Sequence, residues 1–227
     1  MPLRLPSERD WAEAAGALRS SARPGDAVQI WPAWAERARM FVDAAPLLAE
    51  EDLAQADYVG VQRLWLLSLP RAPYARNPQG ALRARGATAA SQEQRFGALA
   101  LQPWDLHAPQ LAADLTRADE EHEVDYVARR CLRLAIGSRI ASRGAAGRIL
   151  HFRAGIIGER AYDKGRPPIV VQIFSGGAPL GVLAVDGPGW RKLDVELPSG
   201  PEERDFLFAV SSPDAARPFC LQGWTTR

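Results

Sequence analysis

The chain has 227 residues, of which 47% are hydrophobic and 24% are charged, as is ordinary for a folded domain with a substantial core. Its formal net charge is +1 and its basic and acidic residues are interleaved, so no global field or polybasic arm favours nucleic acid or an anionic membrane. No apolar run has the length of a membrane-spanning helix, and the N-terminus lacks an apolar segment of signal-peptide length. These features predict a cytosolic chain or a fragment of a longer protein.

The first half of the chain alternates helical and strand patterns. Ser7 is predicted to cap a helix that ends near Ala22, before the breaker Pro24-Gly25. The run Gln62–Ser68 (QRLWLLS) predicts a strand buried on both faces. The other elements predicted in this half are a strand over Ala27–Trp31, a helix over Ala33–Asp43, a partial helix within Ala81–Arg95 and a strand over Ala98–Gln102.

This alternation predicts a small three-layer α/β domain, half Rossmann-like with parallel strands, over residues 1–105. Residues 106–124 are predicted to be a linker, with a short helix near Pro109–Leu115 and the acidic cluster Asp119–Glu123.

From Tyr126 onward the hydrophobic period changes to two, with glycine and proline turns between the runs. Alternation of this kind predicts an antiparallel β-sandwich over residues 125–227, jelly-roll-like or immunoglobulin-like in topology. The apolar positions that share a face are Leu132, Leu134 and Ile136; Ile169, Val171 and Ile173; Leu193, Val195 and Leu197; and Phe206, Phe208 and Val210.

The only two cysteines, Cys131 and Cys220, lie in the first and last predicted strands of the sandwich. Such strands are often close together, so a disulfide is compatible with this fold, but two unrelated thiols fit the sequence equally well. A catalytic cysteine is disfavoured, because no histidine or asparagine forms a recognisable motif with either residue.

Two tryptophans, Trp190 and Trp224, alternate with polar residues on the predicted strands that hold them. Exposed aromatic rings beside polar groups suit sugars, whose rings have an apolar face and polar edges. Arg153 and Gln222 are the predicted polar partners of such a site. The alternative is that a loop or another domain covers both rings, which is the commoner fate of tryptophan.

No motif in the chain predicts a catalytic, cofactor or metal site. His122 lies in an acidic segment without ligand spacing, His107 is isolated, and His151 fits an ordinary strand histidine. Asp26 marks an end of the first predicted strand, where open α/β sheets bind ligands, but no glycine-rich phosphate loop follows it. Turn formation is the simpler role for Asp26.

Several phrases of the chain together resemble the soluble C-terminal region of bacterial multi-spanning glycosyltransferases of the dolichyl-phosphate-mannose-protein mannosyltransferase-like family. The phrases that carry the resemblance are DWAEAAGALR (10–19), PGDAVQIWPAW (24–34), RLWLLS (63–68), RFGALALQPWDL (95–106), RCLRLAIG (130–137) and RPFCLQGW (217–224).

The resemblance implies a periplasmic or envelope-associated accessory domain without catalysis of its own, because catalysis in that family belongs to acidic loops of the membrane part. It also makes a Cys131–Cys220 disulfide reasonable, since such a compartment is oxidising. The implied partners are a glycan or the membrane portion of a glycosyltransferase, with no nucleic acid and no membrane insertion by this chain.

Three hypotheses of function follow. The first is a non-catalytic, carbohydrate-binding accessory domain of a cell-envelope glycosylation system. The second is a stand-alone enzyme with its site at the strand ends of the α/β half, near Asp26, Trp31 and Ser68. The third is a structural protein-interaction domain.

Overall fold

The structure is a computed structural model that describes residues 5–48, 53–72, 77–118, 120–125, 127–199 and 202–227. The chain divides into two compact units, Met1–Pro109 and Gln110–Arg227. No helix in the described ranges is long and apolar enough to cross a membrane.

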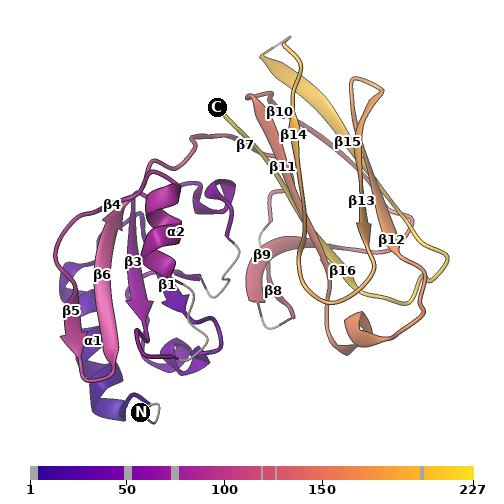
Figure 1. Ribbon diagram of the computed structural model, residues 1–227. Helices are drawn as coiled ribbons and strands as arrows, with labels where there is room; N and C mark the ends of the chain where they lie inside the picture. The colour runs from indigo at the N-terminus through magenta and orange to yellow at the C-terminus, as the bar shows by residue number, and fades with distance from the viewer. Residues whose placement is uncertain (1–4, 49–52, 73–76, 119, 126, 200–201) are drawn as a thin grey trace. The chain divides into compact units, whose positions relative to one another are not determined.

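Unit 1 is built on one mixed sheet, in the strand order β2-β1-β3-β6-β4, with β5 paired to β6 (Figure 1). Strand β1 is parallel to β2 and β3, whereas β6 is antiparallel to β3, β4 and β5. Its elements are α1 (Glu8–Ser21), β1 (Asp26–Trp31), the 3₁₀ helix η1 (Glu36–Met40), β2 (Leu47–Leu48), the 3₁₀ helix η2 (Gln55–Tyr58), β3 (Arg63–Ser68), α2 (Pro78–Ala84), β4 (Thr88–Ala89), β5 (Gln94–Phe96) and β6 (Leu99–Asp105).

The predicted start of α1 and the predicted central strand are both confirmed. The Ser7 hydroxyl accepts from the Asp10 backbone N–H, and the Asp10 carboxylate accepts from the Ser7 backbone N–H, which completes a capping box. Five of the six residues of β3 are buried, so the sheet is covered on both faces. Trp11, Ala14 and Leu18 of α1 pack on one of them.

The predicted half-Rossmann domain is wrong. Its third strand returns antiparallel through the β5–β6 hairpin, whose tip is Gly97 at a φ of +57°, a conformation that glycine adopts without strain. The alanine-rich segment forms only the seven-residue helix α2, which Gly86 follows at a φ of +79°. The predicted helix over Ala33–Asp43 is the short 3₁₀ helix η1. With two α-helices among the described residues, the chain is mostly β.

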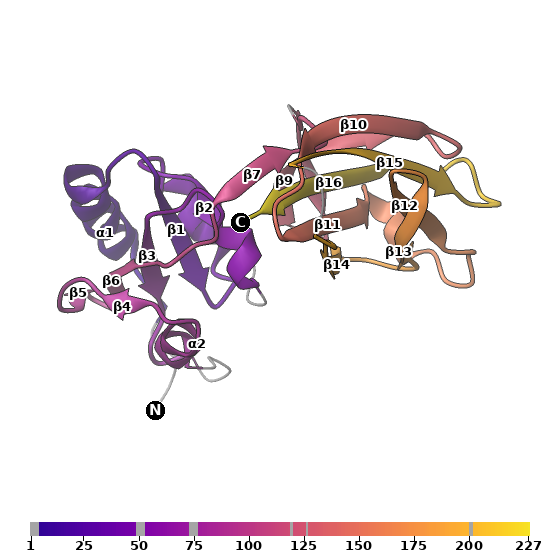
Figure 2. The ribbon, with the colours of Figure 1, turned by 90° about the horizontal axis from the view of Figure 1, so that it is seen from above.

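Unit 2 consists of two antiparallel sheets that resemble a β-sandwich (Figures 1 and 2). The four-stranded sheet has the order β10-β15-β12-β13, and the six-stranded sheet has the order β14-β11-β16-β9-β8, with β7 paired to β16. The strands are β7 (Leu111–Asp114), β8 (Glu120–Val124), β9 (Val127–Leu134), β10 (Arg139–Ala145), β11 (Ile149–Ile156), β12 (Ile169–Ser175), β13 (Ala178–Val185), β14 (Arg191–Glu196), β15 (Glu203–Ser211) and β16 (Phe219–Thr226), with the 3₁₀ helix η3 at Glu159–Tyr162.

The inner faces of these sheets form one core, which includes Phe152, Ile173, Phe208 and Leu221. On β12 and β15 the core residues alternate with more exposed outward residues, which is the predicted period of two. The segment predicted as a linker, 106–124, contains the strands β7 and β8, and β7 stands where a short helix was predicted.

Candidate functional site

The outer face of the six-stranded sheet holds the residues that the sequence singled out. Arg153 of β11 and Gln222 of β16 are register partners, and His151 of β11 stands opposite Trp224 of β16 and Asp194 of β14. Trp190 comes directly before β14 and two residues before Lys192. In the register of the sheet it lies opposite Gly155 of β11. Arg153, Gln222 and Trp224 are therefore neighbours, whereas Trp190 lies on the other side of β11.

Arg153 is the centre of a buried polar cluster. Its side chain is completely buried, its Nη1 donates to Asp194 Oδ1 at 2.7 Å and to the Phe152 carbonyl at 2.9 Å, and its guanidinium stacks 5.2 Å from the Trp224 ring centroid. His151 joins the cluster through Nδ1, 2.9 Å from Asp194 Oδ1, and through Nε2, 2.8 Å from the Thr226 hydroxyl.

Asp194 carries the negative charge of this cluster. Partial burial raises its pKa, but hydrogen bonds from His151 and Arg153 and the charge of Arg153 outweigh that effect and lower the pKa from 3.8 to about 2. Its side chain is still 44% exposed, so the carboxylate contacts both the buried Arg153 and the solvent. This arrangement neutralises a buried cation and requires no ligand.

The β8–β9 hairpin covers part of the same face. A Cβ built on Gly155 would lie 2.5 Å from Val124 Cγ1, so Val124 rests directly on the β11 backbone. The indole N–H of Trp190 donates to the Val127 carbonyl at 3.2 Å, and the Arg129 guanidinium lies 5.7 Å from the Trp190 ring centroid. Trp190 therefore anchors the hairpin and is not a free platform.

Strand β9 joins the sheet only through its last residues. Leu132 to Leu134 pair with β16, whereas further back the side-chain amide of Gln222 donates to the Arg130 carbonyl. A disulfide between Cys131 and Cys220, whose Cα atoms are 5.8 Å apart, joins the strands at this point.

The predicted sugar site of Trp190, Trp224, Arg153 and Gln222 is therefore partly assembled and partly covered. The indole nitrogen of Trp224 and Oε1 of Gln222 are buried without a hydrogen-bond partner among the described residues. In this structure a ligand cannot contact Arg153, because no part of that side chain is exposed.

The outer face of the opposite sheet is arranged in rows across its strands. One row holds Arg139, Ala209 and Gln172, on β10, β15 and β12 respectively. The next row holds Ala141, Leu207 and Phe174 on the same strands. The third places Arg143 opposite Asp205. Charged and polar side chains therefore flank a central apolar row.

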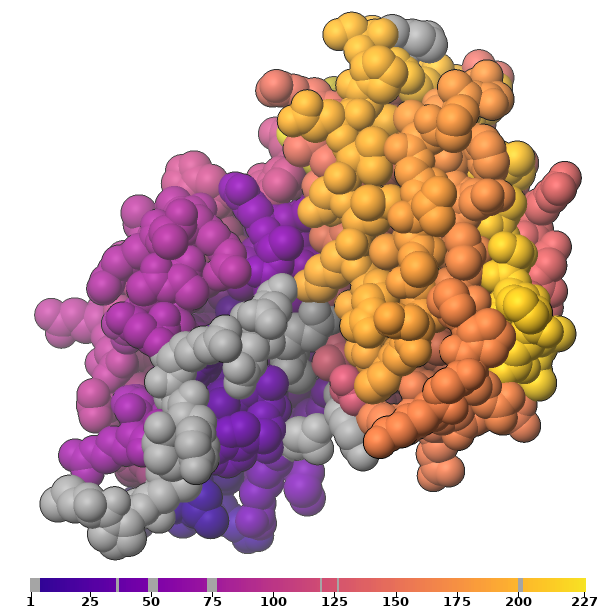
Figure 3. Space-filling model, turned by 45° about the vertical axis from the view of Figure 1, so that its right-hand side comes forward, coloured from indigo at the N-terminus to yellow at the C-terminus, as the bar shows by residue number. Residues whose placement is uncertain are grey.

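A groove of about 610 Å³ follows these rows. Its floor includes Phe174, Leu207 and Ala209, which are half-buried, and its polar rim includes Arg139, Gln172 and Asp205, which are exposed. At one end the tight turn Gly176-Gly177 after β12 leaves the floor open. We refer to this feature as the sheet groove. Figure 3 shows one face of unit 2, on which orange atoms of the chain adjoin gold atoms.

The sheet groove was missed at the sequence level, although the signal was present. Gln172 and Phe174 alternate with the core residues Val171 and Ile173, and Leu207 lies between Phe206 and Phe208. An apolar residue on the outward register of a strand was the sign of a second apolar face.

Only two of the three residues named for the alternative enzyme site lie together. Trp31 and Ser68 are register partners at the carboxyl ends of β1 and β3. Asp26 is the first residue of β1, so it lies at the opposite end, about 17 Å away at 3.3 Å per residue. Its carboxylate accepts from the Arg23 backbone N–H at 3.0 Å and from the Trp65 indole N–H at 2.8 Å, and it stabilises the turn.

The histidines do not form a metal site. His122 contacts Glu120 on its own strand, with 3.2 Å between Nε2 and Oε2, and the His107 carbonyl accepts from the Gln55 side chain. In the ranges that the structure describes, no group of three or more metal-ligating side chains lies close enough to hold an ion.

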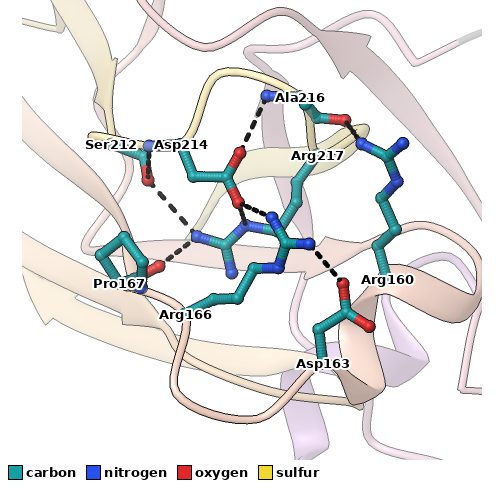
Figure 4. Close-up of polar contacts among 8 residues, drawn as sticks. All are labelled: Arg160, Asp163, Arg166, Pro167, Ser212, Asp214, Ala216 and Arg217. Atoms are coloured by element: carbon teal, nitrogen blue, oxygen red, sulfur yellow. Dashed lines mark hydrogen bonds and ion pairs between the residues drawn. The ribbon is translucent and has the colours of Figure 1, made fainter.

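A second arginine cluster fastens two loops of unit 2 (Figure 4). Arg217, which is 2% exposed, donates to the Pro167 carbonyl and lies 3.3 Å from Asp214 Oδ2 and from the Ser212 hydroxyl. Arg166 bridges Asp214 at 2.8 Å and Asp163 at 3.0 Å. These groups use one another as partners, so the cluster is structural.

A hollow of about 1050 Å³ lies between the β10–β11 turn and the β14–β15 loop. Two of its charged residues have local partners: Glu203 pairs with Arg143 at 3.0 Å, and Arg204 donates to the Pro198 carbonyl. Residues 200–201 of the same loop lie outside the described residues, so no site is assigned there.

No family model and no curated protein matches the chain. Among solved structures, carbohydrate-binding modules share a partial similarity with it. The structure of the CBM51-2 and INT domains of Clostridium perfringens ZmpB has a TM-score of 0.33 at 15% identity, over 62% of this chain and 29% of that one. The chain therefore spans about three tenths of the ZmpB structure.

Two single modules are covered over most of their own length. A CBM36 module in complex with calcium and xylotriose has a TM-score of 0.33 at 10% identity, over 51% of this chain and 98% of the module. A family 35 module from an environmental isolate has a TM-score of 0.31 at 11% identity, over 52% of this chain and 88% of the module.

Proposed function

We propose that this protein is a glycan-binding module that holds a saccharide in the sheet groove. The observation that carries the proposal is the row order of that face, in which a central apolar row lies between two polar rows. A pyranose ring has the matching chemistry, since its apolar face packs on an aromatic or aliphatic floor while its hydroxyls reach side chains at the rim.

The groove provides these contacts without rearrangement. Phe174 and Leu207 are register partners on adjacent strands, so together they form a floor about 5 Å wide between the strand axes. Gln172 offers both an amide donor and a carbonyl acceptor, and Asp205 offers acceptors only. A site on the central strands of a sheet is also rigid, which reduces the entropy lost on binding.

The context we propose is an accessory role in a cell-envelope glycosylation system, beside a membrane glycosyltransferase. Its support is the resemblance of the six sequence phrases. Fractionation of the native host, with an antibody against this chain, tests this part. A soluble cytoplasmic product of this length would contradict it.

The binding proposal is tested by affinity electrophoresis of the purified chain in gels that contain plant and bacterial polysaccharides. Phe174→Ala with Leu207→Ala should weaken retention about tenfold or more, because both floor contacts are removed. Trp190→Ala with Trp224→Ala, on the other sheet, is the comparison pair. Thermal unfolding of every variant shows whether it is folded.

Each outcome decides between the two faces. Loss of retention only in the Phe174/Leu207 variant supports the sheet groove. Loss only in the Trp190/Trp224 variant moves the site to the outer face of the six-stranded sheet. If the wild-type chain is retained by no polysaccharide, the proposed function is wrong.

A further inference from the structure

We infer that the sheet groove selects an acidic glycan, with the sugar carboxylate held at Arg139. The inference rests on the proposed function and adds the chemical class of the ligand. It comes from the difference between two arginines on one strand.

Arg139 and Arg143 both project from the outer face of β10, two alternations apart. Arg143 has a carboxylate partner, with 3.0 Å between its Nε and Glu203 Oε2. Arg139 has no ion pair with any residue that the structure describes, yet it lines the groove. Its guanidinium is therefore the cation that remains available to a ligand.

Ala209 makes room for such a ligand beside Arg139. It stands directly between Arg139 and Gln172 in their row, and its side chain is a single methyl group. Two strand spacings separate Arg139 from Gln172, about 10 Å between Cα atoms. The small Ala209 thus forms the bottom of a notch, with the Arg139 guanidinium on one side and the Gln172 carboxamide on the other.

A carboxylate matches this notch. A guanidinium presents parallel N–H donors that fit the two oxygens of a carboxylate, and the Gln172 amide provides a further donor from the other side. The site is open to water, so the gain comes from paired, charge-assisted hydrogen bonds, and salt should weaken it.

Asp205 makes the two ends of the sheet groove different in charge. It lies four residues from Ala209 along β15, about 13 Å away, with Leu207 between them. A second carboxylate at that end would be repelled, whereas sugar hydroxyls can donate to Asp205. The ligand is therefore a saccharide with an acidic unit at the Arg139 end and hydroxyls at the Asp205 end.

Trigalacturonic acid and its full methyl ester are suitable probes, because they share the same rings and differ in charge. Isothermal titration calorimetry of the wild-type chain should give about tenfold tighter binding of the acid at low salt. Arg139→Gln should reduce this preference to near one, mainly by weakening the binding of the acid. Arg143→Gln is the control, with the same charge change on the same strand, and should keep the preference.

The other outcomes separate failure of this inference from failure of the proposed function. Equal binding of acid and ester by the wild type overturns the acidic preference and leaves a neutral glycan site. An unchanged preference in Arg139→Gln overturns the role of Arg139. Equally tight binding of a poly-glutamate peptide overturns the choice of a sugar. Failure to bind any saccharide, acidic or neutral, contradicts the proposed function itself.

Discussion

The two outer faces of the sandwich differ in whether their arginine side chains are buried or exposed. On the six-stranded sheet, Arg153 is fully buried beside Asp194, and the β8–β9 hairpin, fixed by a disulfide, lies over part of the face. On the four-stranded sheet, Arg139 is exposed beside an uncovered apolar row. The same alternation of residues therefore produces a structural face in one sheet and, in the other, the open groove that we propose as the binding surface.

The comparison shows that an outward register does not by itself make a residue available. Trp190, Arg153 and Gln222 all point outward from their strands, yet each has a partner in the hairpin, in the cluster or in the β9 backbone. Phe174 and Leu207 point outward as well, but they line the sheet groove. What separates the faces is a segment folded over one of them.

The largest expected effect comes from removing the disulfide that fixes the covered face. Cys131→Ala with Cys220→Ala should lower the free energy of unfolding by about 4 kcal/mol. The disulfide joins residues 89 positions apart and so restricts the conformations of the unfolded chain, and the variant removes that restriction. Urea unfolding without reductant measures this loss. The wild type in reductant should match the variant, and a stable, unchanged variant would contradict a structural role.

Arg153→Ala should cost about 3 kcal/mol, because it leaves a partly buried carboxylate without its cation and removes the stacking on Trp224. Arg139→Ala is the matched control on the open face and should change the free energy of unfolding by less than about 0.5 kcal/mol. Equal losses in the two variants would remove the distinction between the faces.

Gly155→Ala tests the contact by which the β8–β9 hairpin covers this face. The new methyl group would lie 2.5 Å from Val124 Cγ1, so the hairpin must shift, at a cost of about 1 to 2 kcal/mol. Adding Val124→Ala should recover part of that loss, and the double-mutant cycle should show favourable coupling. Strictly additive effects would mean that Val124 and Gly155 do not touch in solution.

The smallest effect is the pH dependence from Asp194. Because its folded pKa is lowered from 3.8 to about 2, its contribution is complete above the unfolded pKa and is lost as the pH falls through the folded value. Half exposure reduces this contribution to about 1 kcal/mol. The stability advantage of the wild type over Asp194→Asn should therefore disappear between about pH 5 and pH 2, and a constant difference would contradict it.

The parts of the fold that the sequence predicted are those with local causes. The Ser7 cap of α1, the buried run of β3 and the period-two burial of β12 and β15 depend on nearby residues and are confirmed. The alanine-rich segment after β3 shows the limit, since helix propensity is weak beside the pairing of β4 and β5 with β6. The direction of β6 was likewise set by tertiary pairing.

The candidate sites show the same division. Alternation put Gln222 with Trp224, and Arg153 with His151, on one face of their own strands, and it placed Cys131 and Cys220 opposite the core positions; that the two strands are neighbours is shown only by the structure. Alternation contained no information on the hairpin, because the contacts of Val124 with Gly155 and of Val127 with Trp190 join residues 31 and 63 positions apart. Coverage of a face is a long-range property, and a pattern of neighbours does not encode it.

The position of β16 also determines the order in which the sandwich can fold. Phe219–Thr226 pairs with β11, β9 and β7, supplies Phe219 and Leu221 to the core, and contributes Cys220 to the disulfide. Within this sandwich, a central strand of one sheet is thus the last strand to be synthesised. Until it emerges, β7, β9 and β11 lack their common partner, so a ribosome-bound intermediate would expose the core to aggregation or to a chaperone.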